Sequence, residues 1–122
     1  MRFVRLADPR ALRAAWWASR SAGRARRQLR AGGINAVSLP PPPELPETAG
    51  VGMSAALRLR RETCLVRAAV RQQWLAAHGS PRDMVIGVRG PVRGLRAHAW
   101  LDGDAPCHSE GFEELLRRPA SR

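Results

Sequence analysis

The stretch Thr63-Cys64-Leu65-Val66-Arg67-Ala68-Ala69-Val70 decides the fold, because it begins the main helix that this chain predicts. Apolar residues recur at helical spacing from here to about His78, where Gly79 ends the pattern and Ser80-Pro81 begins a turn. The stretch therefore predicts a helix with Cys64 at its mouth. Its buried face would consist of Leu65, Val66, Ala69, Val70, Gln73, Trp74 and Ala77.

Two strands should follow this helix. Residues 84–88 are apolar on both faces, which is typical of an interior strand, and residues 95–102 alternate cleanly. In the second strand Leu95, Ala97, Ala99 and Leu101 would face one way, and Arg96, His98, Trp100 and Asp102 the other. Residues 103–106 predict a hairpin turn, 107–110 a third short strand and 112–118 a small helix. The predicted fold class is α+β, with the cysteine-bearing helix packed on a small antiparallel sheet.

The chain before the main helix divides into parts of different composition. Asp8-Pro9 is a good helix start, and a helix rich in alanine, leucine and arginine is expected over residues 10–30, ended by Gly32-Gly33. Residues 34–39 predict a short extended piece. Four prolines at 40–43 favour a stiff polyproline II spacer, and a short helix is expected over 54–60. We therefore expect an N-terminal Arg-rich helical segment at 1–39, a proline-rich linker at 40–50 and a domain at 51–122.

The positive charge is concentrated in the first half of the chain. All 21 basic residues are arginines, against 10 acidic residues, for a net charge of +11. Residues 1–61 alone carry a net +9, with twelve arginines and three acids. Such a face can hold RNA, DNA, an anionic membrane or an acidic peptide, or it can simply be a solvated helix face. Because no RNA-recognition, zinc-finger or helix-turn-helix pattern accompanies the charge, nucleic acid is not the expected partner.

The two cysteines predict free thiols and no metal centre. Cys64 and Cys107 could form one disulfide, but the sequence shows no signal peptide and no apolar run that would span a membrane. A reducing cytoplasmic location is therefore expected. The adjacent pair Cys107-His108 has no recognised zinc-ligand spacing, so no metal and no other cofactor is predicted.

Cys64 and His98 are the candidate nucleophile and general base. A thiol on a helix followed by an imidazole on a strand is the arrangement of papain-like and transglutaminase-like cysteine enzymes. The helix N-terminus, together with Arg60, Arg61 and Arg67, would favour a thiolate at Cys64, whose backbone N–H could also stabilise an oxyanion. Trp100 would share the face of His98 and shield the pair from water. The alternative is that Cys64 is a small buried apolar residue and His98 a packed one.

A third residue must orient the imidazole, and Glu110 is the predicted one. Asp102 shares a face with His98 but lies about 13 Å along the strand, and Asp104, in the turn, should be farther away. If 95–102 pairs with 107–110, a one-residue change of register brings Glu110 beside His98. Ser109 or a backbone carbonyl is the alternative. Asp102 is expected to be a surface or substrate-facing carboxylate.

From Thr63 onward the chain resembles the leader peptidases of lasso peptide biosynthesis, the protease subunits of the B-protein family, which are related to transglutaminase-like cysteine proteases. The resemblance rests on several motifs in a fixed order and covers about the last half of the chain. They are Thr63-Cys64-Leu65-Val66-Arg67-Ala68, Trp74-Leu75, Val85-Ile86-Gly87-Val88, Ala97-His98-Ala99-Trp100-Leu101, Gly111-Phe112 and Glu114-Leu115. The upstream helix, the proline-rich linker and the chain length also resemble the split form of the family, in which a separate small protein recognises the leader.

The resemblance implies a specific reaction. The enzyme would hydrolyse one peptide bond in a ribosomally made precursor peptide, and a separate ATP-dependent cyclase would then close the core into a macrolactam. Cys64 would carry the family's nucleophile and His98 its base. The family's acid is usually an aspartate about a dozen residues after the histidine, where this chain has Glu110.

The Arg-rich front half would then bind the leader-recognition protein or an acidic leader, with Arg24, Arg26 and Arg27 as the candidate residues, while Trp100 and Asp102 would face the substrate. Two alternatives stay open. One is an acyl transferase of the same fold, whose thioester is resolved by an amine instead of water. The other is a non-catalytic module that binds a peptide or nucleic acid.

Overall fold

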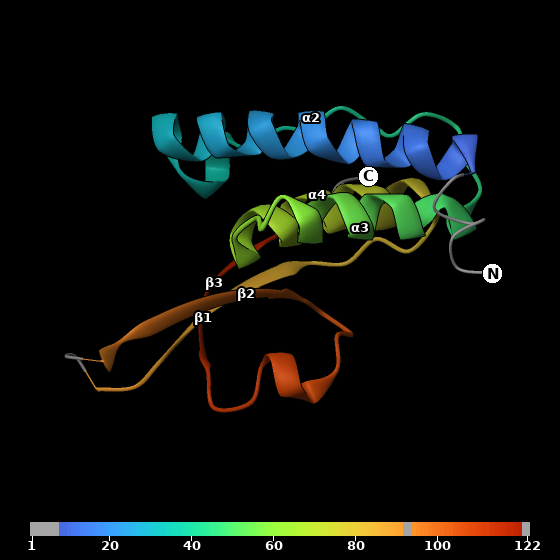
Figure 1. The fold of residues 1–122 in the computed structure, drawn as a ribbon. Helices are drawn as coiled ribbons and strands as arrows, with labels where there is room; N and C mark the ends of the chain where they lie inside the picture. The colour runs from blue at the N-terminus through green and yellow to red at the C-terminus, as the bar shows by residue number, and fades with distance from the viewer. Residues whose placement is uncertain (1–7, 92–93, 121–122) are drawn as a thin grey trace.

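The computed structural model describes residues 8–91 and 94–120, apart from the Cys107 side chain, and shows an α+β fold of three helices and a three-stranded sheet. The helices are α2 (Pro9–Gly32), α3 (Gly50–Leu59) and α4 (Cys64–Ala77). The strands are β1 (Met84–Arg89), β2 (Arg96–Leu101) and β3 (Glu113–Arg118), and short 3-10 turns are η1 (Ile34–Ala36), η2 (Glu47–Ala49) and η4 (Pro106–His108). Figure 1 shows α2 above α3 and α4, with the sheet below them.

Helix α2 begins and ends as its sequence predicts. The Asp8 carboxylate caps the first turn by accepting a hydrogen bond from the backbone N–H of Arg10, and Gly33 follows the last residue. The face toward α3 and α4 is built almost entirely from small residues, which lets the helices approach closely. At Gly52 of α3 an added Cβ would lie 1.9 Å from the carbonyl oxygen of Ala11, so no larger residue fits there.

Residues 34–39 do not form the extended piece that was expected. Ile34–Ala36 is instead a 3-10 turn, because the backbone turns sharply at Gly33, which has a φ of 74°, and Ala36 N–H bonds back to the Gly33 carbonyl. The chain after this turn runs back along α2. There the Gln28 side chain exchanges two hydrogen bonds of 3.0 Å with the backbone of Ser38.

The corner between α3 and α4 fixes the position of Cys64. Helix α3 starts earlier than expected, at Gly50, and ends in a Schellman motif in which Glu62 N–H bonds to Leu57 C=O and Arg61 N–H to Arg58 C=O. Arg61 takes the left-handed conformation that this motif needs, with a φ of 52°. Thr63 then caps α4, so that Cys64 is the first helical residue.

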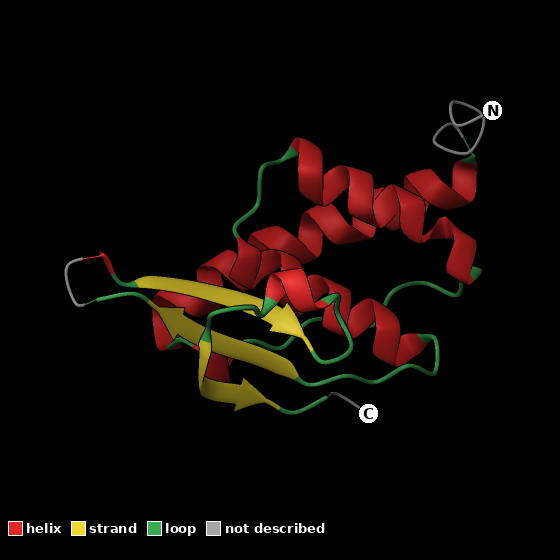
Figure 2. Cartoon of the chain, turned by 90° about the horizontal axis from the view of Figure 1, so that it is seen from below, coloured by secondary structure: helices red, strands yellow, loops and turns green. Residues whose placement is uncertain are grey.

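The sheet has the order β2-β1-β3, with both neighbours antiparallel to the central strand (Figure 2). The predicted third strand over 107–110 and the predicted helix over 112–118 are therefore wrong. Pro106 has no N–H to donate to a strand ladder and begins a 3-10 turn instead. Residues 113–118 have helical propensity, but the free edge of β1 recruits them as β3, so that tertiary pairing overrides local preference.

One hydrophobic core lies between α2, α3, α4 and the helix-facing side of the sheet. Trp17 of α2 and Trp74 of α4 pack against each other in this core with ring centroids 5.9 Å apart, and Ala99 and Leu101 contribute to it from β2. The division into residues 1–39, 40–50 and 51–122 stays a prediction. Among the described residues, no helix has the length and apolar character needed to cross a bilayer.

Candidate active site

Cys64 and His98 line the same pocket, which has a volume of about 410 Å³. Cys64 reaches it from the start of α4 and His98 from β2, the strand at the edge of the sheet. In the described part of the chain, no hydrogen bond joins the thiol to the imidazole. The rest of the wall comes from α3, α4 and the segment after β2: Ser54, Leu57, Arg58, Arg67, Ala68, Arg71, Ala99, Asp104 and His108.

The local sequence places the Cys64 thiol at the N-terminus of α4. The Thr63 hydroxyl accepts a 3.3 Å hydrogen bond from Val66 N–H, and the Thr63 carbonyl accepts one of 2.9 Å from Arg67 N–H. Cys64 is thus in the first turn, where backbone N–H groups have no intrahelical acceptor. Its side chain is a free, partly exposed thiol. A substrate carbonyl entering the pocket would therefore meet both the sulfur and an unpaired amide.

His98 lies in an aromatic cluster. The centroid of its ring lies 5.9 Å from that of Trp100, 5.4 Å from that of Phe112 and 6.4 Å from that of His108. The imidazole planes of His98 and His108 are only 11° apart. His98 and Trp100 point to the face of β2 opposite Ala99 and Leu101, as the alternation predicted. The pocket accordingly runs around the β2 edge of the sheet, where both faces of this strand can contribute side chains.

The surroundings of His98 favour its neutral form. Partial burial lowers the pKa of His98 below its usual value of 6.5, and the positive charges of His108, Arg67 and Arg89 lower it further. Asp104 acts in the opposite direction but is outweighed. A neutral imidazole can accept a proton at neutral pH, which is the state that a general base needs.

Asp104 is the carboxylate that the structure brings to the pocket, in contrast to the expectation that it lies far from His98. The chain turns back after β2, with Asp104 N–H bonded to Leu101 C=O, and so carries the side chain to α4. Arg71 binds both carboxylate oxygens, at 2.8 and 3.1 Å, and Leu101 N–H binds one at 3.0 Å. Burial raises the pKa of Asp104, but these hydrogen bonds outweigh it and hold the pKa below its ordinary value.

Glu110 lies outside the pocket lining. It is exposed at the end of the turn that follows η4, where its backbone N–H bonds to Pro106 C=O. The strand pairing expected to bring it beside His98 does not form, because residues 106–108 form the η4 turn instead of a strand. No hydrogen bond links the Glu110 carboxylate to the His98 ring in the described part of the chain. Ser109, the alternative, donates its hydroxyl to Pro106 C=O at 3.4 Å.

The other predicted site residues are engaged in contacts within the protein. Trp100 is a buried member of the aromatic cluster, and the Asp102 carboxylate accepts a hydrogen bond from Arg117 of β3. In the basic helix, Arg26 binds both carboxylate oxygens of the buried Glu62, at 2.9 and 3.0 Å. The Arg26–Glu62 ion pair joins α2 to the end of α3 and so stabilises the fold.

The remaining two arginines of the predicted docking set differ from each other. Arg24 donates from Nε to the backbone carbonyl of Ser38 at 3.0 Å, although its side chain is exposed. Arg27 is exposed and has no salt bridge in the described part of the chain. It is therefore the member of the set whose charge is least engaged by the described part of the protein.

Arg58, Arg71 and His108 were not predicted as pocket residues. Arg71 had a signal in the sequence, because a spacing of seven residues puts it on the same helix face as Cys64. Arg58 and His108 had none, since their positions depend on the α3–α4 corner and on the η4 turn. The charged wall of the pocket is therefore a product of tertiary structure.

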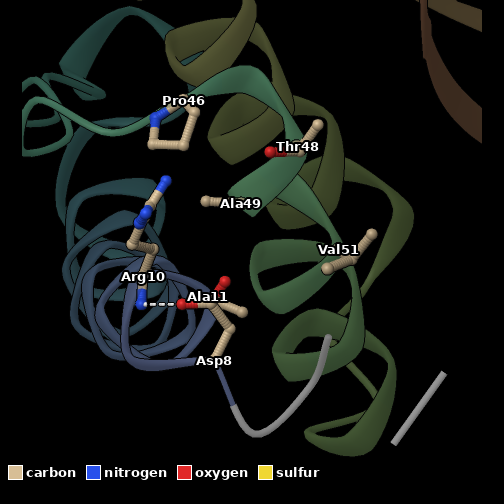
Figure 3. A pocket seen from close by; sticks show the side chains of 7 residues that line it. All are labelled: Asp8, Arg10, Ala11, Pro46, Thr48, Ala49 and Val51. Atoms are coloured by element: carbon tan, nitrogen blue, oxygen red, sulfur yellow. Dashed lines mark hydrogen bonds between the residues drawn. The ribbon is translucent and has the colours of Figure 1, made fainter. Parts of the chain in front are cut away.

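A second hollow, of about 350 Å³, lies between the starts of α2 and α3 (Figure 3). Its lining includes Asp8, Arg10 and Thr48, and the Asp8 carboxylate is occupied by the helix cap. It contains neither cysteine nor histidine. Across the described residues there is no group of three or more histidine, cysteine and acidic side chains that could bind a metal ion.

The sequence model of the Transglutaminase-like superfamily matches residues 5–117. The chain belongs to this superfamily. Its members are generally cysteine proteases or acyltransferases, which is consistent with a thiol and an imidazole in one pocket. Comparison with curated proteins and with solved structures gave no significant match.

Proposed function

We propose that this protein is a cysteine peptidase that removes the leader from a ribosomally made lasso peptide precursor, acting with a separate leader-recognition protein before an ATP-dependent cyclase closes the core. The observation that supports this most is the shared pocket of Cys64 and His98 in a chain of the transglutaminase-like superfamily. The order of the sequence motifs supports the lasso peptide pathway over other peptide substrates.

The reaction begins when His98 takes the proton of Cys64 and the sulfur attacks the carbonyl carbon of the scissile peptide bond. The negative charge on the carbonyl oxygen is stabilised by backbone N–H groups of the first turn of α4. His98 then gives the proton to the departing amine, which releases the core and leaves the leader as a thioester on Cys64. Water attacks the thioester, and the free thiol and the leader carboxylate are restored.

The thiol and the imidazole make no hydrogen bond in the free protein, and such contacts commonly tighten only when substrate binds. Because the neutral state of His98 is favoured, the base is ready before the substrate arrives. Trp100 and Phe112 cover the ring and limit the access of water to it. A peptide that fills the pocket would exclude water further and bring the two groups together.

Glu110 is proposed as the acid that orients His98. Its carboxylate is exposed and, in the described part of the chain, engaged in no salt bridge, whereas both oxygens of Asp104 are bound by Arg71. Glu110 also lies only two residues after His108, whose ring is parallel to that of His98. Asp104 acts at longer range, through the charge that it places near the imidazole. Asp102 and Trp100 are proposed to border the path of the peptide.

The experiment that tests the function is mass spectrometry of a precursor peptide incubated with this protein and the leader-recognition protein. Wild type is compared with Cys64→Ala and with Cys107→Ala, the matched change at the other cysteine. The proposal predicts a single cleavage with wild type and Cys107→Ala, and none with Cys64→Ala. Intact precursor with all three proteins, while the complex forms, would contradict it and favour a binding module.

An acyl transferase is the second candidate, because the superfamily also contains acyltransferases. It differs only in the group that resolves the thioester. Adding a primary amine to the same reaction separates the two, since a transferase would give an amide of the leader instead of the free carboxylic acid.

A further inference from the structure

An apolar groove with a basic rim lies between α2 and the proline segment that follows it. Figure 1 shows that α2 is separated from the sheet by α3 and α4. We call it the α2 groove. It has a volume of about 580 Å³, and its most prominent side chains are exposed: Trp16 is 65% and Leu12 56% accessible. Large apolar residues exposed side by side are typical of surfaces that bind a partner. The groove is lined by Leu12, Arg13, Trp16, Trp17, Pro41 and Pro43.

Hydrogen bonds join the proline wall of the groove to α2. Trp17 donates its indole N–H to the Pro40 carbonyl at 3.1 Å, which fixes the proline segment against α2. Arg24 and Gln28, about two and three helical turns after Trp17, hold the backbone of Ser38 in the same way. The prolines add little conformational freedom that binding would have to remove. A partner would therefore meet a preformed surface with a low ordering cost.

The rim of the groove is cationic. Helix α2 contains seven arginines and no acidic residue. The Arg20 guanidinium lies over the Trp16 ring, 4.8 Å from its centroid, and Arg13 lines the groove itself. Arg13, Arg20 and Arg27 take part in no salt bridge among the described residues. Their charge is available to an acidic partner.

A buried hydroxyl beside the groove also lacks a partner. Ser21 is 1% exposed, and its Oγ makes no hydrogen bond within the part of the chain that the structure describes. It lines a hollow of about 230 Å³ that shares Trp16 and Trp17 with the groove and continues along α2 to Arg24 and Arg27. Buried polar groups are usually hydrogen-bonded, so an unpartnered Oγ beside this hollow is unusual.

From these observations we infer that the α2 groove is the docking surface for a protein partner that presents an acidic segment with an aromatic or aliphatic anchor. The anchor would lie on Trp16 and Leu12, and the acids would meet Arg13, Arg20 and Arg27. The identity of the partner rests on the proposed function, under which it is the leader-recognition protein. A second copy of this chain is disfavoured, because it would bring two strongly positive faces together.

The position of the groove favours the recognition protein over the peptide that is cut. No residue of α2 lines the pocket of Cys64 and His98, and α2 is separated from the sheet by α3 and α4. A protein bound to the groove would leave the pocket open. Recognition of the leader would then take place at the α2 groove, and cleavage at the pocket of Cys64 and His98.

The test measures the affinity of the leader-recognition protein for the full chain by calorimetry. Trp16→Ala and the pair Arg13→Glu with Arg20→Glu change the groove. Leu59→Ala, at a residue that is 84% exposed on α3, and Arg30→Glu, on α2 outside the groove, are the matched controls. We expect Trp16→Ala to weaken binding about tenfold or more, the charge pair to weaken it at least as much, and the controls to change it less than twofold.

Unchanged affinity in both groove variants would overturn the inference, and so would a wild type that does not bind the recognition protein. The same variants are also tested for binding to a short RNA, for binding to anionic vesicles and for self-association. If one of these is lost while binding to the recognition protein is kept, the groove belongs to a different partner and the inference is contradicted. Precursor cleavage is measured separately. If Trp16 controls binding but Cys64→Ala still cleaves the precursor, the docking surface stands and the proposed peptidase mechanism fails.

Discussion

Arg71 and Asp104 join the helix of Cys64 to the turn that follows the strand of His98. The guanidinium of Arg71 binds both oxygens of the carboxylate, at 2.8 and 3.1 Å, and the Asp104 side chain is only 8% exposed. Because Arg71 is two helical turns after Cys64, this pair sets the distance between the two sides of the pocket. A bidentate contact of this kind fixes orientation as well as distance.

Removing this pair should therefore affect both stability and catalysis. Arg71→Gln leaves a largely buried carboxylate without its main partner, and we expect the free energy of unfolding to fall by about 1–3 kcal/mol, measured by urea denaturation. The value of kcat/KM for precursor cleavage should fall as well. In a double-mutant cycle with Asp104→Asn, the two losses should be clearly less than additive. Additive losses would mean that the contact is not energetically coupled.

The pH dependence of cleavage should report the state of His98. Its pKa is lowered, so kcat/KM should stay high to below pH 6.5 and fall only as the imidazole becomes protonated. Arg67→Gln removes a positive charge and should move this acidic limb to higher pH, whereas Asp104→Asn should move it to lower pH. The measurement compares the pH at which kcat/KM falls to half of its plateau value in each variant, and not the plateau value itself. Shifts in the reverse directions would contradict the assignment of the base.

His98 should also affect stability at acid pH. Because its pKa is lower in the folded than in the unfolded chain, the unfolded chain binds more protons as the pH falls below about 6.5. The stability contributed by the neutral ring is therefore present above this pH and is lost as the pH falls through the folded pKa. His98→Gln should flatten this part of the stability profile, measured by urea denaturation across the pH range.

The absence of a side chain at Gly87 leaves the space that the Trp100 ring occupies. An added Cβ would lie 2.6 Å from the Trp100 ring and 2.9 Å from the Glu113 carbonyl oxygen. Gly87→Ala should therefore displace Trp100 from under His98 and cost about 1–3 kcal/mol of unfolding free energy, seen by urea denaturation and by a change in tryptophan fluorescence. Gly23→Ala is the matched control in the interior of α2, where the nearest atoms are arginine side-chain ends at 3.6 Å. That change should be neutral or stabilising.

Arg61 and Gly79 occupy the same position in two helix ends. Both follow a C-cap, both have a positive φ (52° and 77°), and both helices end with the paired bonds of a Schellman motif. Arg61→Gly should therefore raise the melting temperature by relieving a left-handed conformation, worth up to about 1 kcal/mol. Gly79→Ala should lower it by a similar amount. A fall in melting temperature with Arg61→Gly would show that the arginine side chain contributes more than the backbone costs.

Helices α2 and α4 could be predicted well from the sequence because their signals are local. Asp8-Pro9, Gly32-Gly33 and Gly79 act on their immediate neighbours, and the bounds of α2 and α4 followed from them. The α+β fold class and the alternation of β2 were also confirmed. β3 was missed because its sequence has helical propensity, and only the exposed edge of β1, about thirty residues earlier in the chain, makes it a strand.

The candidate site could be predicted in part. Cys64 and His98 were identified from their residue types and their elements, and they line one pocket. Asp104 was misplaced because its position depends on a tight turn and on Arg71, neither of which has a distinctive local pattern. The ion pair between Arg26 and the buried Glu62 could not be predicted, because it joins α2 to the end of α3 across a tertiary contact.

The central claim is that the Cys64 sulfur forms a covalent bond with the leader. The most direct measurement is the intact mass of the protein after brief reaction with the precursor and recognition protein, followed by an acid quench. We predict an adduct equal to the leader mass less one water, removed by hydroxylamine, present in Cys107→Ala and absent in Cys64→Ala. An adduct that persists in Cys64→Ala, or cleavage that continues in that variant, would contradict the assignment of Cys64 as the nucleophile.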